Sequence, residues 1–138
     1  MYKVKKAVEI FELIHSVDSL DLAREIDRQA AKINKIQDIL LEIKTSQEKS
    51  KFGLGVQDLP IAVSEMEKLK QVRIKGLMTI APLGSSGELA RPYFSQLREL
   101  RDKLNPDWLL SMGMSDDFEA AIAEGADIIR VGRLIFEG

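Results

Sequence analysis

The sequence predicts an α/β fold built from parallel β/α repeats within a single domain. Two observations indicate this fold: β-rich apolar runs of strand length recur along the 138 residues, and amphipathic stretches with helical spacing separate them. Parallel strands need such crossover connections, and about five strands are expected. An intact eight-stranded barrel has more than about 200 residues. Five units therefore cannot close one, and we expect two strands at bare edges.

Each element is predicted by a local pattern. Apolar residues three and four apart predict helices, runs rich in Ile, Leu and Val predict strands, and Gly, Asn and Pro end elements. Asp18 or Ser19 is the expected N-cap of the second helix, and Asn105-Pro106 is expected to stop the fourth. The expected helices are residues 3–12, 20–33, 59–70, 88–104 and 116–124, and the expected strands are residues 13–17, 36–45, 74–80, 108–110 and 128–132.

Composition excludes several classes of partner and chemistry. The formal net charge is −2 with both signs interspersed, so we expect no nucleic-acid partner. The chain has no cysteine, which excludes disulfides, thiolate metal sites and a catalytic thiol. No apolar run approaches the length of a bilayer span, and the N-terminus lacks the apolar core of a signal peptide. A cytoplasmic protein without a membrane partner is the expectation.

The stretch from Leu109 to Phe136 carries the clearest chemistry. A strand ending at Leu110 is expected to enter a turn of small residues, Ser111–Ser115, whose N–H groups can approach an anion closely. Ser115 is the expected N-cap of a short helix that Gly125 ends, with two aspartates in its first turn. The pattern predicts a β-α-β unit with a phosphate-binding turn; the alternative is a tight turn and a capped helix without a ligand.

These residues also carry a resemblance to a known family. SMGMSDDFEAAI followed by RVG resembles the C-terminal signature of the pyridoxal phosphate homeostasis protein family, as do IHSVDS, TSQEKSKFGL and GLMTIAP in the same order along the chain. Members of that family resemble the barrel half of alanine racemases. The resemblance implies a TIM-type (β/α)8 barrel, of which residues 1–138 form about five units with the N-terminal units missing. It also implies pyridoxal 5′-phosphate (PLP) as cofactor and a role in vitamin B6 homeostasis.

The resemblance implies which residues hold the cofactor. Those expected at the phosphate are Ser111, Gly113, Met114, Ser115, Gly132 and the N–H of Arg133, and those expected at the ring are Arg130 and Met78. Arg130 would donate to the pyridine nitrogen; the alternative is an outward-facing Arg130 paired with a helix acid such as Glu124. A core residue is almost as good an explanation of Met78. Where the family often has a small hydroxyl residue, this chain has Arg133, whose guanidinium could contact the phosphate itself.

Catalysis is not expected from this chain. The resemblance begins just after the third family strand, so the lysine that attaches the cofactor covalently is expected to be missing. Lys44, at a strand end, is a remote substitute, whereas Lys49 and Lys51 are expected in a solvated loop. His15 is the only histidine, which excludes a histidine metal cluster and leaves a structural role as its simplest explanation.

Two alternative functions remain open at this point. A racemase-like fragment would need a lysine and a tyrosine, but Tyr2 and Tyr93 fall in predicted helices. A half-barrel could instead be an interaction module that associates with another copy through its exposed strand edges.

Overall fold

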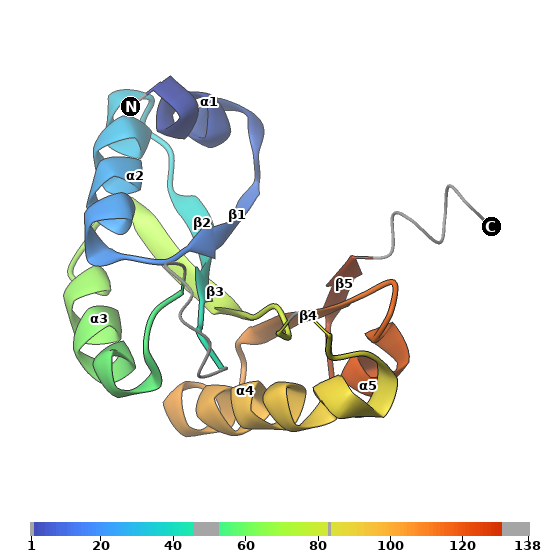
Figure 1. Ribbon diagram of the computed structural model, residues 1–138. Helices are drawn as coiled ribbons and strands as arrows, with labels where there is room; N and C mark the ends of the chain where they lie inside the picture. Colours follow the sequence, from blue (N-terminus) through green and yellow to red (C-terminus); the bar gives the residue numbers. More distant parts are fainter. Residues whose placement is uncertain (1, 46–52, 83, 131–138) are drawn as a thin grey trace.

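The computed structural model describes residues 2–45, 53–82 and 84–130. Its centre is one sheet of five strands in the order β1-β2-β3-β4-β5, and each strand pairs in parallel with the next. The strands are β1 (Leu13–Val17), β2 (Gln37–Glu42), β3 (Val72–Met78), β4 (Leu109–Met114) and β5 (Ile128–Arg130). The sheet curls into an open half-barrel with β1 and β5 at its two edges (Figure 1). The predicted fold class, with about five parallel units, is confirmed.

One helix precedes β1, the others connect the strands, and the helices pack on one side of the sheet (Figure 1). They are α1 (Tyr2–Ile10), α2 (Leu20–Lys32), α3 (Leu59–Met66), α4 (Arg91–Leu104) and α5 (Phe118–Ala123), with short 3₁₀ helices η1 (Val56–Asp58) and η2 (Gly87–Ala90). All five expected helices are present among the described residues. The third ends at Met66 rather than at residue 70, and the fourth begins as the separate turn η2.

The N-terminus of α2 shows how local signals set an element. Ser19 has extended backbone angles, and its side chain accepts a hydrogen bond from the N–H of Leu22 at 3.1 Å. Such a cap satisfies one of the free N–H groups of the first turn and is worth about 1 kcal/mol. One face of the helix then buries Ala23, Ile26 and Ala30 in the hydrophobic core. Of the two caps considered, Ser19 is therefore the one used.

The largest departure from the sequence prediction lies in β4. Ser111–Met114 were expected to form a turn, but they continue the strand, which pairs with β3 through Ser111 and with β5 through Ser111 and Met114. Ser111 and Met112 are buried, so sheet pairing and burial outweigh the weak β-propensity of these residues. The turn is shorter and covers residues 115–117, so neither Asp116 nor Asp117 lies inside the helix.

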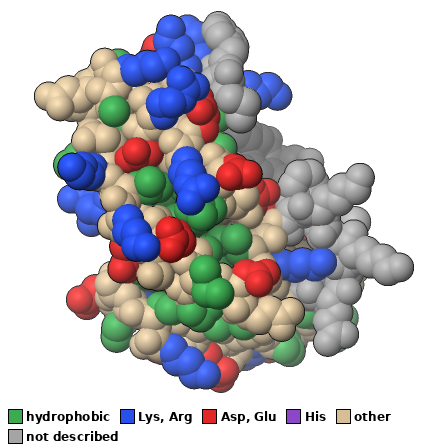
Figure 2. All heavy atoms as spheres, turned by 90° about the vertical axis from the view of Figure 1, so that its left-hand side faces the viewer, with side chains coloured by type: hydrophobic (Ala, Val, Ile, Leu, Met, Phe, Trp, Pro, Cys, Tyr) green, Lys and Arg blue, Asp and Glu red, His purple; other side chains and the backbone are tan. Residues whose placement is uncertain are grey.

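The surface over α2 and α3 carries both signs of charge (Figure 2). Ion pairs join neighbouring side chains along these helices: Arg24 with Asp21, Arg28 with Glu25, and Lys68 with Glu65. This face therefore has no extended field of one sign, which agrees with the interspersed charges of the sequence. Among the described residues, no helix has both the length and the apolar character that crossing a bilayer requires.

Candidate functional site

A cavity of about 410 Å³ lies where β3, β4 and β5 end. In parallel β/α folds, ligands bind at the carboxyl ends of the strands, so this is the expected end for a site. One wall is the segment after β3, the other is the turn after β4, and the last residue of β5 completes it. The lining residues are Ile80, Ala81, Pro82, Gly84, Ser85, Met114, Ser115, Asp116, Asp117 and Arg130.

The turn between β4 and α5 is closed by hydrogen bonds between its own ends. The N–H of Met114 donates to Oδ1 of Asp117 at 2.7 Å, and the N–H of Asp117 donates to the carbonyl of Met114 at 3.1 Å. Ser115 was expected to cap the helix, but Asp117 occupies the N-cap position. The Met114 N–H is thus engaged within the protein, while the Ser115 residue lines the cavity. Of the predicted phosphate donors Met114 and Ser115, Ser115 is the better placed, because the N–H of Met114 already donates to Asp117.

Gly113 lets α5 approach β4 closely. Its φ is +105°, and a Cβ atom added there would lie 2.7 Å from Cβ of Ala121 and 3.3 Å from Cα of Phe118. Gly113 itself does not line the cavity. Its contribution to the site is to allow the contact that sets the position of α5, and with it the position of the turn that precedes α5.

Ser111 and Met78 lie inside the strands rather than on the cavity. Both side chains are buried, and neither is among the lining residues. Oγ of Ser111 lies 3.5 Å from Nδ1 of His15, which β1 contributes from the opposite edge of the sheet. A fully buried hydroxyl cannot meet a substrate, so the arrangement gives no support to a catalytic serine and histidine. The contacts of Ser111 and Met78 with a cofactor remain predictions without support from the cavity.

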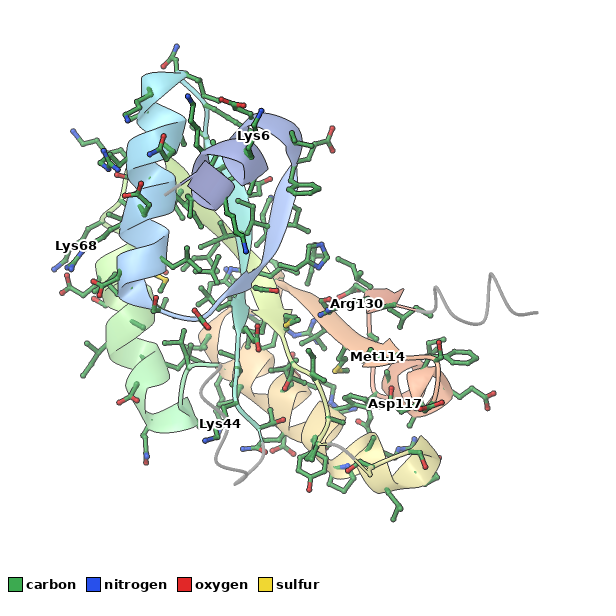
Figure 3. All side chains as sticks on the ribbon, turned by 45° about the horizontal axis from the view of Figure 1, so that its top comes forward. Lys6, Lys44, Lys68, Met114, Asp117 and Arg130 are labelled. Carbon is green, nitrogen blue, oxygen red and sulfur yellow. The ribbon has the colours of Figure 1, made fainter. Side chains whose placement is uncertain are left out.

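Arg130 brings a positive charge to the cavity from the end of β5. Its guanidinium has no hydrogen bond or ion pair with any other residue that the structure describes. The alternative partner, Glu124, contacts Arg91 at 3.1 Å and Arg98 at 2.7 Å, so the proposed Arg130–Glu124 pair is wrong. Figure 3 shows Arg130, at the end of β5, close to Met114, at the end of β4, and to Asp117 in the turn that follows β4.

The charge of Arg130 affects the pKa values of two nearby residues, His15 and Glu42. Burial, and then the nearby guanidinium, lower the pKa of His15 below its usual value. Burial, and then the charge of Asp18, raise the pKa of Glu42, while Arg130 opposes this rise. Glu42 was not among the expected site residues, although a carboxylate within the apolar run ILLEI was a visible signal.

Lysine is absent from the described lining of the cavity. Figure 3 shows Lys44, Lys6 and Lys68 apart from the group formed by Met114, Asp117 and Arg130. Lys44 thus lies away from the candidate site. Four residues of interest, Lys49, Lys51, Gly132 and Arg133, lie outside the described residues.

The cavity combines polar and charged groups with an apolar wall. The hydroxyls of Ser85 and Ser115 are donors for an anion, Arg130 adds a positive charge, and the wall from Ile80 to Pro82 is apolar. The volume falls within the range of about 300–1,000 Å³ that is typical of small-molecule sites. Of the two carboxylates on the wall, Asp117 is already bound to the Met114 N–H. Ser85 was missed because its Pro and Gly loop has no periodic pattern.

Comparisons with known proteins point to the same family. The family model described as "Alanine racemase, N-terminal domain" matches residues 2–138. Two curated relatives, both called pyridoxal phosphate homeostasis protein, are 45% identical (Aquifex aeolicus) and 41% identical (Synechocystis), each over 139 residues. The matches cover 97% of this chain but only 61% and 64% of the relatives. The chain therefore spans less than two thirds of the length of these relatives.

Solved structures agree with the fold. PipY of Synechococcus elongatus with PLP bound superposes with a TM-score of 0.85 at 40% identity, covering 98% of this chain and 65% of PipY. Its PLP-free structure gives a TM-score of 0.87 at 41% identity, covering 98% and 66%. The alanine racemase of Clostridium difficile gives 0.73 at 14% identity, covering 98% and 38%, which supports the fold alone. The resemblance read from the sequence motifs is thus confirmed.

Proposed function

The chain belongs to the alanine racemase N-terminal domain family, and we propose that it binds pyridoxal 5′-phosphate and takes part in the homeostasis of this cofactor in the cytoplasm. Relatives named for that role match almost the whole chain, and a structure of PipY carries PLP. The observation that carries the proposal is the position of Arg130. It supplies a cation without a described partner on a cavity that also offers an apolar wall and two serine hydroxyls.

Each part of the cavity has a role in this proposal. Ser115, with Ser85 on the facing wall, holds the phosphate, because hydroxyl donors to an anion make short and strong hydrogen bonds. Ile80 and Pro82 cover the ring. Arg130 donates to the ring nitrogen and keeps it unprotonated. Gly132 and Arg133 follow Arg130 after Val131 in the sequence and remain proposed phosphate contacts.

We propose a binding function without turnover. When bound, PLP supplies an aldehyde and an electron-accepting ring, and an unprotonated ring nitrogen makes that ring a weaker electron acceptor. The described lining of the cavity has no lysine, tyrosine or histidine that could move a proton there. The relatives are named for homeostasis rather than for a reaction. Binding and release of the cofactor are the steps that the described residues support.

A titration with three variants tests the proposal. PLP and pyridoxal, which lacks the phosphate, are titrated by equilibrium dialysis into the wild type, Arg130→Met, Ser115→Ala and the control Arg24→Met. Arg24 is an exposed arginine of α2, so its loss changes the net charge equally without touching the cavity. We expect tighter binding of PLP than of pyridoxal. Arg130→Met should weaken PLP binding by about tenfold or more, the size of one charged hydrogen bond.

Two results would contradict the proposal. Equal PLP affinity of Arg130→Met and Arg24→Met would contradict the role of the cavity. Equal affinity of the wild type for PLP and pyridoxal would contradict a phosphate site.

A further inference from the structure

The two walls of the cavity come from different parts of the chain and are tied together beside it. One wall is the segment that precedes η2, and the other is the turn that precedes α5. The N–H of Gly87, in η2, donates to the carbonyl of Asp116, in the turn, at 2.9 Å. A movement of α5 relative to η2 and α4 therefore changes the distance between the two walls.

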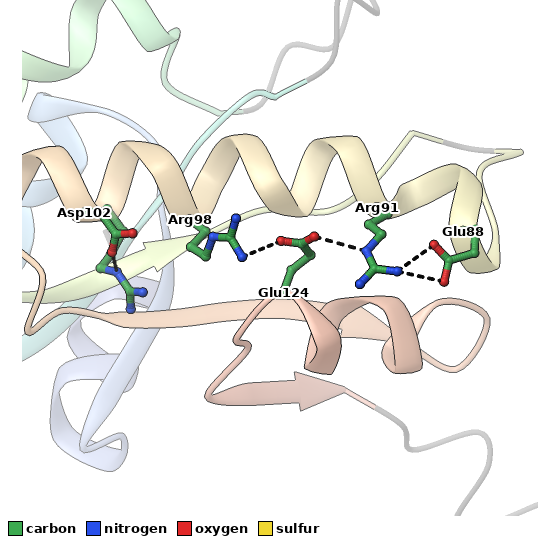
Figure 4. Close-up of polar contacts among 6 residues, drawn as sticks. Glu88, Arg91, Arg98, Asp102 and Glu124 are labelled. Carbon is green, nitrogen blue, oxygen red and sulfur yellow. Dashed lines mark hydrogen bonds and ion pairs between the residues drawn. The ribbon is translucent and has the colours of Figure 1, made fainter.

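A row of four charged side chains joins α5 to η2 and α4 (Figure 4). Glu88 in η2 pairs with Arg91 at 3.0 Å, and Arg91 donates through Nε to Oε1 of Glu124 at 3.1 Å. Arg98, two turns further along α4, lies 2.7 Å from Oε2 of the same Glu124. Glu124 follows α5 directly and is its C-cap residue. One carboxylate thus holds the C-terminal end of α5 between two arginines of α4.

Burial distinguishes Glu124 from the other members of the row. Its side chain is 12% exposed, whereas that of Glu88 is 74% exposed. Exposed ion pairs contribute little to stability, while removing one partner from a shielded pair leaves the other charges uncompensated. Oε2 of Glu124 is buried and accepts no hydrogen bond from the described residues; its charge is compensated by the Arg98 guanidinium, whose Nη1 lies 2.7 Å away. Glu124 is therefore the member whose loss should affect the row most.

The other end of α5 carries the turn of the candidate site. The helix has only six residues, Phe118–Ala123, and it packs on β4 through the close contact between Gly113 and Ala121. Because the helix is so short, releasing its C-terminal end can tilt it about this contact. That tilt would move the turn at residues 115–117 and disturb the two hydrogen bonds between Met114 and Asp117.

We infer that Glu124 is a positioning residue for the phosphate-binding turn: by holding Arg91 and Arg98, it fixes α5 and keeps the turn at residues 115–117 aligned with the facing wall. The inference rests on the proposed function for its ligand. Glu124 does not line the cavity, so it acts through α5 and makes no contact with the anion itself.

Hydrogen exchange of the turn tests the inference without any ligand. The variant is Glu124→Gln, which keeps the shape and removes the charge. The control is Asp102→Asn, which breaks an ion pair with Arg101 on the same helix, α4, that does not reach α5. We expect the amides of Met114 and Asp117 to exchange about tenfold faster in Glu124→Gln, the size of one coupling between contacting residues, and to be unchanged in Asp102→Asn.

Binding of inorganic phosphate and PLP gives the second readout. Glu124→Gln should weaken both by a similar factor, and Asp102→Asn should weaken neither. Unchanged amide exchange in Glu124→Gln, or an equal effect of Asp102→Asn on either readout, would overturn the inference. If Glu124→Gln does not fold, Arg91→Lys takes its place, because lysine keeps the charge but cannot donate to Glu88 and Glu124 as the guanidinium does. Unchanged amide exchange in Arg91→Lys would also overturn the inference. A wild type that binds neither ligand contradicts the proposed function alone, since exchange still decides the role of Glu124.

Discussion

Replacing Gly113 by alanine tests the packing on which the site depends. A non-glycine residue at a positive φ costs about 1–2 kcal/mol. The added Cβ would also lie 2.7 Å from Cβ of Ala121 and 3.2 Å from Cγ2 of Ile129, and overpacking of this kind costs about 1–3 kcal/mol. We therefore expect a loss of about 2–5 kcal/mol in the free energy of unfolding, out of about 5–15 kcal/mol for a domain of this kind.

Gly84→Ala is the matched control for this experiment. Gly84 has a similar φ of +86°, but an added Cβ there meets nothing within 4 Å, so only the backbone cost of about 1–2 kcal/mol applies. Urea unfolding of both variants, followed by circular dichroism, compares the midpoints at a common slope. If Gly113→Ala is no less stable than Gly84→Ala, the close packing of α5 on β4 is not as described and the reasoning about the turn fails with it.

Four further predictions follow from the same structure. Because the pKa of Glu42 is raised in the folded state, its ionisation lowers the free energy of unfolding as pH rises from about 4.5 through the pKa of the folded protein. Glu42→Gln should therefore be more stable than the wild type at pH 7, and a lower melting temperature of this variant would contradict the prediction. Because the pKa of His15 is lowered in the folded state, the free energy of unfolding should fall as pH drops below about 6.5. The urea midpoint of His15→Gln should lack this part of the pH dependence, and a pH curve parallel to that of the wild type would refute the prediction. Thr79→Val should cost about 1–3 kcal/mol, because the Thr79 hydroxyl donates to Ile43 at 2.8 Å and pairs with the buried Thr45 hydroxyl at 3.0 Å; the double valine variant in urea unfolding should lose less than the sum of the two single losses. Borohydride reduction after mixing with PLP should leave no pyridoxyl group on a defined lysine, and a single modified peptide in the mass spectrum would reject this expectation.

The strand edges give one more expectation, carried from the sequence. β1 and β5 each have one neighbour in the described sheet, and unpaired strand edges favour association with another chain. We expect the mass measured by light scattering to rise with protein concentration. A constant monomer mass would count against pairing of the edges.

The alternation of strands and helices could be predicted because its signals are local. The Ser19 cap and the helical spacing of α2 depend on residues within a few positions of each other. The length of β4 could not be predicted in the same way. Ser111-Met112-Gly113-Met114 has the composition of a turn, and only pairing with β3 and β5, from distant parts of the chain, makes it a strand.

The candidate site, too, has features that the sequence could predict and features that depend on distant parts of the chain. The family resemblance implied that Arg130 contacts the cofactor ring, and in the structure Arg130 lines the cavity. Ser111 and Met78 were expected at the cofactor from motif positions, but the direction of a strand side chain depends on register, which a motif does not specify. Ser85 and Glu124 were not expected at a site or in its support, since only the fold brings Ser85 to the cavity and Glu124 between Arg91 and Arg98.

The extension of β4 changes how an anion would be held. With Ser111–Met114 in the strand and the Met114 N–H bound to Asp117, the short turn offers fewer donors than a five-residue cradle. The second donor group must then come from the facing wall, where Ser85 lies. Under the proposed function, affinity for phosphate would therefore depend on the separation of two walls that different elements carry, rather than on one preformed loop. For this reason we expect Glu124, which lies outside the cavity, to affect binding within it.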